Sequence, residues 1–212
     1  MKHVYKLLVE DGLPETDYTR EEFEPIDGSF ESFEITDTSD DGGTKSLGGE
    51  LNIGREVTTS NPPTQVRRKR LGKAIPMADF ISAPRGAVFI SDRVKEIIES
   101  FEPNVHQFFP MTVSHRGQEI GPLNYLIIGS RLDSLDAEAC YPPIPTGARI
   151  WKRDRKNPAQ NKIVVSAAAI EGKHLWHDQR VIGLRMISPE LMAAFMEADV
   201  KGLRDAKPFE VL

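Results

Sequence analysis

The chain has 212 residues, a net charge of −5 and a hydrophobic share of 39%. These values are ordinary for a folded globular protein with one large domain, or one domain and an extension. The sequence predicts no membrane-spanning helix, because no apolar run approaches the ~18 residues that a bilayer requires. The first residues gain acids by Glu10, which is atypical of a secretory signal, and Cys140 is the only cysteine, so no internal disulfide can form. We expect a cytoplasmic protein.

Charge is distributed unevenly along the chain. Residues 5–9 predict a first β-strand, and the stretch from Glu10 to Glu56 then carries fifteen acidic and three basic residues. This stretch is poor in aliphatic residues and rich in turn formers, although three phenylalanines are spaced along it: Phe23, Phe30 and Phe33. We therefore expect residues 1–75 to form an irregular acidic segment that packs on a domain of residues 76–212. Its acids serve either as a solvated face or as a surface for a basic partner.

A basic run follows the acidic stretch. Arg67, Arg68, Lys69, Arg70 and Lys73 place five positive charges within seven residues. Such a run can bind nucleic acid, but no aromatic residue interleaves with it to stack on bases. An internal partner in the acidic segment is the alternative explanation.

The rest of the chain alternates apolar stretches with turn signals. Residues 78–81 and 87–90 are short apolar stretches, and the second predicts a strand that leads to Ser91 and a helical pattern running to Glu102. A strand at 105–113, demoted in part by Pro110, and a strand at 125–128 predict a hairpin around Gly117. Further short strands are expected at three places: 150–151, 163–165 and 209–211.

The strand–serine–helix pattern is written a second time near the end. An apolar run again leads to Ile-Ser, and Ser188 and Pro189 stand at the first positions of a second helical pattern. Gly202 lies where a left-handed residue would close this helix. We expect both serines to be N-caps, and both helices to pack on one shared antiparallel sheet. The fold class predicted is α+β, a mostly antiparallel sheet with two strand–Ser–helix units and an irregular acidic N-terminal segment.

Residues that carry chemistry form no complete catalytic pattern. His174 and His177 have the His-x-x-His spacing, which could place two imidazoles on one helical face, but a metal site needs further ligands. Cys140 has no histidine near it in sequence. The segment GGTKS at 42–46 lacks the glycines of a phosphate-binding loop, and Asp133 and Asp136 are typical of a polar loop. We therefore expect no enzyme activity, no cofactor and no required metal.

Several segments together resemble a known family. They are FISAPRGAVFISDRVKEIIESF, VHQFFPMTV, YLIIGSRLDSLDAEAC and RVIGLRMISPELMAAFMEADVKGLRDAKPFEV, within roughly residues 79–211. In their order they resemble the eleventh immunity-protein family of bacterial polymorphic toxin systems, formerly a domain of unknown function. The resemblance implies a cytosolic antidote that binds and neutralises a cognate toxin in competition between bacteria. It implies no catalytic position.

The charge pattern adds an expectation about the partner. If the protein is an antidote, its acidic stretch predicts a basic toxin, with no binding to nucleic acid or membrane. The candidate partner surface consists of five acidic residues: Glu31, Glu34, Asp37, Asp40 and Asp41. Two alternatives stay open, a small metal-dependent enzyme that uses His174 and His177, and a regulatory nucleic-acid-binding module that uses the run from Arg67 to Lys73.

Overall fold

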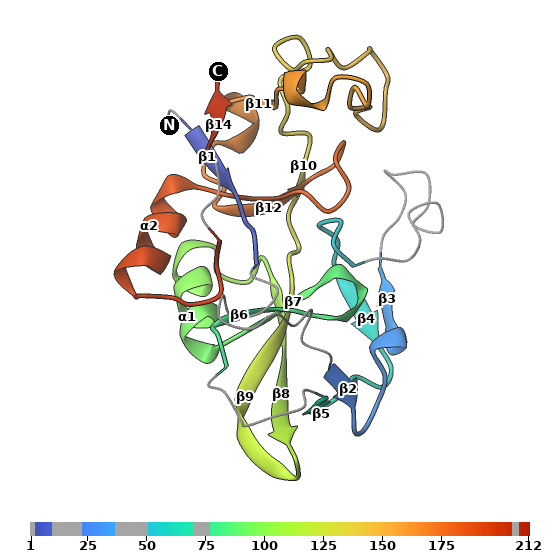
Figure 1. The fold of residues 1–212 in the computed structure, drawn as a ribbon, viewed down its shortest axis with the longest axis vertical. Helices are drawn as coiled ribbons and strands as arrows, with labels where there is room; N and C mark the ends of the chain where they lie inside the picture. The colour runs from blue at the N-terminus through green and yellow to red at the C-terminus, as the bar shows by residue number, and fades with distance from the viewer. Residues whose placement is uncertain (1–2, 10–22, 37–50, 70–76, 205–207) are drawn as a thin grey trace.

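The computed structural model of the chain describes residues 3–9, 23–36, 51–69, 77–204 and 208–212 (Figure 1). Over these ranges the chain forms fourteen β-strands in three sheets and two α-helices. The protein is therefore mostly β, and the predicted α+β class is wrong. The error came from the many strands of two to four residues, which are too short to show a sequence period.

An upper sheet in Figure 1 joins the two ends of the chain. Its strands in spatial order are β10 (Arg131–Leu132), β12 (Leu175–Asp178), β13 (Arg185–Ile187), β1 (His3–Lys6), β14 (Pro208–Val211) and β11 (Val164–Val165). The outer pairs β10–β12 and β11–β14 are parallel, and the inner pairs are antiparallel. The first strand thus depends on strands from the last thirty or so residues of the chain.

A lower sheet surrounds the long hairpin. Its strands in spatial order are β2 (Phe23–Pro25), β5 (Gln65–Arg68), β8 (Gln107–His115), β9 (Gln118–Ile127), β7 (Val88–Ile90) and β6 (Phe80–Ser82). The hairpin expected around Gly117 is confirmed as β8 and β9. A separate pair consists of β3 (Phe33–Ile35) and β4 (Val57–Thr59). The short 3₁₀ turns are η1 (Phe30–Ser32), η4 (Pro84–Gly86), η5 (Pro158–Gln160) and η6 (Ala168–Ile170).

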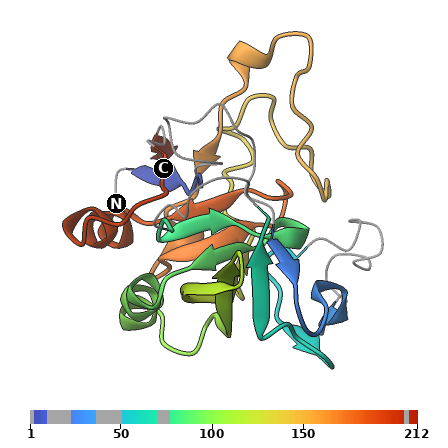
Figure 2. The ribbon, with the colours of Figure 1, turned by 60° about the horizontal axis from the view of Figure 1, so that its bottom comes forward.

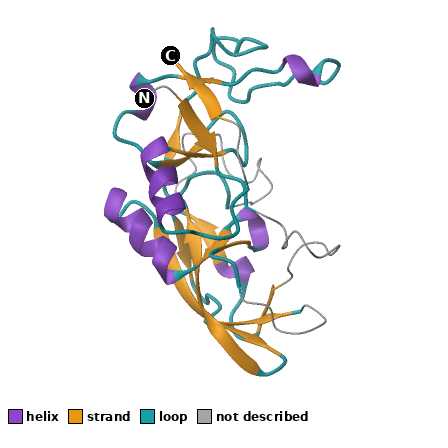
Figure 3. Ribbon diagram, turned by 60° about the vertical axis from the view of Figure 1, so that its left-hand side comes forward, coloured by secondary structure: helices purple, strands orange, loops and turns teal. Residues whose placement is uncertain are grey.

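Both predicted helix starts are confirmed. Helix α1 (Asp92–Phe101) begins after Ser91, whose hydroxyl accepts the N–H of Val94, and α2 (Pro189–Glu197) begins after Ser188, whose hydroxyl accepts the N–H of Leu191. The prediction that both helices pack on one shared sheet is wrong, because α1 follows β7 of the lower sheet and α2 follows β13 of the upper sheet. The helices instead lie side by side (Figure 3) and share one core between the sheets.

The end of α2 also differs from the prediction. The helix ends at Glu197, and the residue with positive φ that follows it is Asp199, at φ 52°. Gly202 does have a positive φ of 91°, but its Cα lies against the carbonyl of Phe80, where a Cβ would come within 2.2 Å of the oxygen. Gly202 is therefore needed for a close approach of two chain segments.

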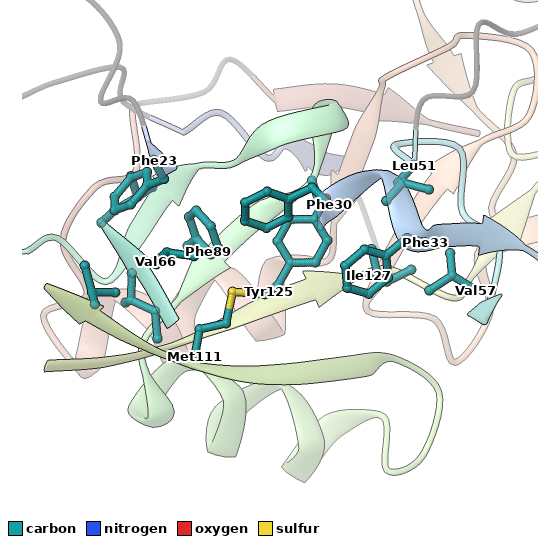
Figure 4. Close-up of a cluster of buried hydrophobic side chains, with 14 residues drawn as sticks. Phe23, Phe30, Phe33, Leu51, Val57, Val66, Phe89, Met111, Tyr125 and Ile127 are labelled. Atoms are coloured by element: carbon teal, nitrogen blue, oxygen red, sulfur yellow. The ribbon is translucent and has the colours of Figure 1, made fainter. Parts of the chain in front are cut away.

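Within the described ranges, apolar side chains form three buried clusters. One lies between the sheets and the helices, one lies under the loops beside the upper sheet, and one covers the far face of the lower sheet. In the last cluster, aromatic residues of the acidic stretch pack on Phe89 and Tyr125 (Figure 4). The boundary at residue 75 stays a prediction, although β1 and β5, which precede it, pair with strands that follow it. Among the described helices, none is long and apolar enough to cross a membrane.

Candidate partner-binding surface

In the described part of the acidic stretch, exposed glutamates alternate with phenylalanines that are buried in the core. Phe30 and Phe33 are buried in the cluster of Figure 4, whereas Glu31 and Glu34 are exposed. In β3 this follows from strand alternation, which turns Phe33 to the core and Glu34 to solvent. Two aromatic anchors therefore hold two carboxylates at the surface. We call Glu31 and Glu34 the acidic face.

Arg85 fixes the backbone beneath the acidic face. Its Nη1 donates to the carbonyl oxygen of Phe30 at 3.0 Å and to that of Phe33 at 2.7 Å. Its Nε lies 4.0 Å from a carboxylate oxygen of Glu31, whose side chain is mostly exposed, so this ion pair adds little. The guanidinium thus holds the backbone while leaving both carboxylates accessible to a partner.

Other acids of the stretch have structural roles. Asp27 accepts the N–H groups of Thr64 and Gln65, both at 2.8 Å, and the hydroxyl of Thr64 at 2.5 Å. The hydroxyl bond, followed by the two backbone bonds, lowers the pKa of Asp27. This carboxylate therefore links the chain just after β2 to the start of β5.

The basic run has an internal partner. Glu24 lies opposite Arg67 in the β2–β5 pair, and its carboxylate lies 3.3 Å from the Arg67 guanidinium and 3.8 Å from the Lys69 ammonium. All three side chains are about half exposed, so each pair is worth little in stability. The contacts nevertheless support the structural explanation for part of the run. Arg70 and Lys73 lie outside the described residues, as do Asp37, Asp40 and Asp41 of the candidate surface.

Neither histidine of the His-x-x-His pattern lies on a helix: one directly precedes β12 and the other lies within it. His174 precedes the strand and lies 2.9 Å from the hydroxyl of Ser188 through its Nδ1, while its ring packs edge-on against Phe101. His177 lies three residues further, and in an extended strand this spacing turns two side chains to opposite faces. The structure therefore does not bring the two imidazoles together.

His177 is buried, and its environment opposes protonation. Burial, followed by the positive charges of Arg185 and Arg131, lowers the pKa of His177 well below its usual value. Within the described ranges, no group of three or more histidine, cysteine or acidic side chains could hold a metal ion.

The remaining reactive side chains have structural environments. Cys140 is buried, and burial raises the pKa of its thiol, which reduces its nucleophilicity. Asp136 accepts the N–H groups of Glu138 and Ala139 at 3.1 and 3.0 Å, and Asp133 pairs with Arg180. The segment GGTKS at 42–46 lies outside the described residues.

The sequence patterns gave no functional role to one further charged segment. Residues 149–162, which we call the basic loop, carry six basic residues and one acid, and nearly all of them are exposed. The signal was present in the sequence as charge density, but a short charge run is usually a solvated loop. Figure 2 shows the loop projecting from the body of the molecule.

The described residues form a mostly β fold whose surface carries the acidic face and the basic loop. The chain belongs to the immunity protein family (Imm11), whose model matches residues 14–207. The resemblance expected over residues 79–211 is confirmed, and it extends into the acidic stretch. No curated protein matches the chain.

Proposed function

We propose that this protein is an antidote that binds a cognate bacterial toxin and neutralises it without catalysis. The observation that carries the proposal is the family match over residues 14–207, because this family is one of immunity proteins. An antidote of this kind works by occupying its toxin, so it needs a shaped surface and no reactive group. Cytoplasmic action, as the family resemblance implies, is part of the proposal.

We propose further that the toxin is basic and meets the acidic face. Glu31 and Glu34 follow buried aromatic residues on a backbone held by Arg85, so this backbone loses little freedom on binding. Opposite charge on the toxin would raise its association rate. Asp37, Asp40 and Asp41 follow β3 directly in the sequence and extend the same proposed surface.

The alternatives receive less support from the described contacts. Each histidine of the enzyme alternative has a structural environment, His174 at the N-cap of α2 and His177 in the interior. For the nucleic-acid alternative, Glu24 already neutralises part of the charge of Arg67 and Lys69.

The experiment is co-expression with the toxin encoded beside this gene. We expect growth rescue that requires about equal amounts of the two proteins, and a stable complex with a catalytically inactive form of the toxin. His177→Ala should preserve rescue wherever the variant still folds, as judged by circular dichroism. Rescue by trace amounts of this protein, or toxin that stays inactive after the protein is removed, would contradict the proposal and favour an enzyme.

A further inference from the structure

The basic loop is a second charged surface that the acidic face does not explain. Its cations are Arg149, Lys152, Arg153, Arg155, Lys156 and Lys162. All six residues are exposed. In the part of the chain that the structure describes, only Lys162 among them has an acidic partner, Glu210 at 2.7 Å. Five adjacent like charges repel one another, which costs stability unless a partner relieves it.

Hydrogen bonds to the rest of the chain hold both ends of the basic loop. At its base, the backbone N–H of the buried Trp151 donates to the carbonyl of Arg180 at 2.9 Å, and its indole N–H donates to the carbonyl of Pro142 at 2.8 Å. Tyr141 and Lys162 exchange two backbone hydrogen bonds, each of 2.9 Å, where the loop returns. The loop is therefore anchored on both sides.

The only acid of the loop is used internally. The carboxylate of Asp154 accepts the backbone N–H groups of Lys156 at 2.8 Å and Asn157 at 3.1 Å, and the side chain of Asn157 at 3.2 Å. The side-chain oxygen of Asn161 accepts the backbone N–H of Asp154 at 2.8 Å, and its side-chain nitrogen donates to the carbonyl of Asp154 at 3.1 Å. Asp154 thus folds the tip of the loop and pairs with none of the surrounding arginines and lysines.

Apolar side chains are exposed around the base of the loop. Tyr141, Ile150 and Ile182 are each exposed by 45–46%, which is unusual for large apolar residues in this molecule. Ile150 precedes Trp151, and the backbone N–H of Trp151 donates to the carbonyl of Arg180. Ile182 is two residues after Arg180 in the chain. Arginine and aromatic residues are enriched in protein-binding surfaces, and the base of the loop exposes Arg149 and Tyr141 as well as the two isoleucines.

The basic loop and the acidic face lie on one flank of the molecule. Arg131 joins the two regions, because its guanidinium donates to the carbonyl of Ile53 at 2.8 Å and to that of Gln179 at 3.3 Å. The loop that contains Ile53 leads to Glu56, whose carbonyl accepts the N–H of Thr36 at the end of β3. Figures 1 and 2 place both surfaces on the side of the molecule away from α1 and α2.

We propose that the basic loop binds an acidic patch on the toxin, while the acidic face binds a basic one. This inference rests on the proposed function and adds a second contact to it. Two contacts of opposite sign on one flank would fix the orientation of the complex and reject wrong partners. A nucleic acid is the weaker candidate, because the chain is acidic overall and the nearby acidic face repels phosphates.

The test measures association of the catalytically inactive toxin, encoded beside this gene, with two matched variants. Arg155→Glu/Lys156→Glu reverses two loop charges, and Arg116→Glu/Arg204→Glu reverses two exposed charges elsewhere. We expect the loop variant to associate about tenfold more slowly at low salt, with a weaker salt dependence, and the control to stay close to wild type. The milder Arg155→Gln/Lys156→Gln, with a smaller expected loss, serves if the charge reversal fails to fold.

The outcomes separate the two proposals. If the wild type does not bind the toxin, the proposed function fails and the loop proposal fails with it. If the wild type binds and the loop variant matches the control, only the loop proposal is overturned. Salt-dependent binding of wild type to a DNA or RNA duplex, lost in the loop variant while toxin binding is unchanged, would assign the loop to nucleic acid instead.

Discussion

The carboxylate of Glu102 accepts the backbone N–H of Leu175 at 2.8 Å and thereby joins the two sheets. Glu102 is the C-cap of α1, which follows the lower sheet, and Leu175 begins β12 of the upper sheet. The same carboxylate accepts the N–H of His174 at 3.0 Å and lies 3.0 Å from Nε2 of His106. Since Nδ1 of His106 accepts the N–H of Gly129, Nε2 carries the proton that is donated to Glu102.

These bonds predict the effect of Glu102→Gln. Burial opposes ionisation of Glu102, but the bonds from His106 and the two backbone groups outweigh it and lower its pKa. An amide cannot accept from donors on both sides, so one buried N–H loses its acceptor. We expect a loss of about 1–3 kcal/mol in the free energy of unfolding, measured by urea denaturation at pH 7. Glu99→Gln, on the same helix, is the control and should change it by less than about 0.5 kcal/mol.

Ser188→Ala tests the second helix cap. The Ser188 hydroxyl accepts the N–H of Leu191 at 3.2 Å, contacts Nδ1 of His174 at 2.9 Å and is fully buried. We expect a loss of about 1–2 kcal/mol, at the upper end of the range for N-caps, because the buried N–H of Leu191 and the partly buried ring of His174 both lose their bond. Ser100→Ala, at an exposed serine of α1, provides the comparison. Equal effects of the two substitutions in thermal denaturation would contradict this role of Ser188.

Features set by neighbouring residues could be predicted from the sequence. Ser91 and Ser188 were recognised as N-caps because a cap depends on a few residues, and Gly117 marked a hairpin that does form. The membership of β7 and β13 in different sheets could not be predicted, since it depends on pairings between residues far apart in sequence. Strands as short as Val164–Val165 exist only through such pairings.

The candidate site was predictable in its charge and unpredictable in its geometry. The sequence identified Glu31 and Glu34 as acids, but it could not show that Glu24 pairs with Arg67 or that Asp27 binds the backbone at the start of β5. His174 and His177 appeared close because a helical spacing was considered, and the extended backbone of β12 separates them. Side-chain partners are chosen in three dimensions, and residue type alone does not reveal them.

Gly202→Ala measures the close approach of the chain to β6. A Cβ at this position would lie 2.2 Å from the carbonyl oxygen of Phe80, in addition to the strain of a positive φ. Gly117→Ala has a similar φ of 79° with no atom within 4 Å of the new Cβ, and it isolates the strain, about 1 kcal/mol. We expect Gly202→Ala to cost clearly more than this control in urea denaturation. Equal losses would show that the backbone relaxes away from Phe80.

His177 predicts loss of stability in weak acid. Burial and the neighbouring Arg185 and Arg131 lower the pKa of His177 in the folded state, whereas the unfolded chain has the ordinary pKa of about 6.5. As pH falls below about 6.5, the unfolded state binds a proton that the folded state excludes, so the free energy of unfolding falls, by up to about 1.4 kcal/mol per pH unit. His177→Gln should flatten this slope between pH 6.5 and the folded pKa. An unchanged slope would assign the effect to other groups.

The acidic face and the three aspartates that follow it serve either toxin binding or the fold, and association rates of substituted variants distinguish the two roles. If the carboxylates serve binding, Glu31→Gln/Glu34→Gln should slow association with the inactive toxin and flatten its salt dependence, without a change in thermal stability. Asp37→Asn/Asp40→Asn/Asp41→Asn should act in the same direction. Glu96→Gln/Glu197→Gln, at exposed acids of α1 and α2, is the control for net charge. If the acids serve the fold instead, the same changes shift thermal stability and leave association unchanged. An association rate equal to wild type at low salt, both for the glutamate variant and for the aspartate variant, would therefore contradict a basic toxin surface at this position.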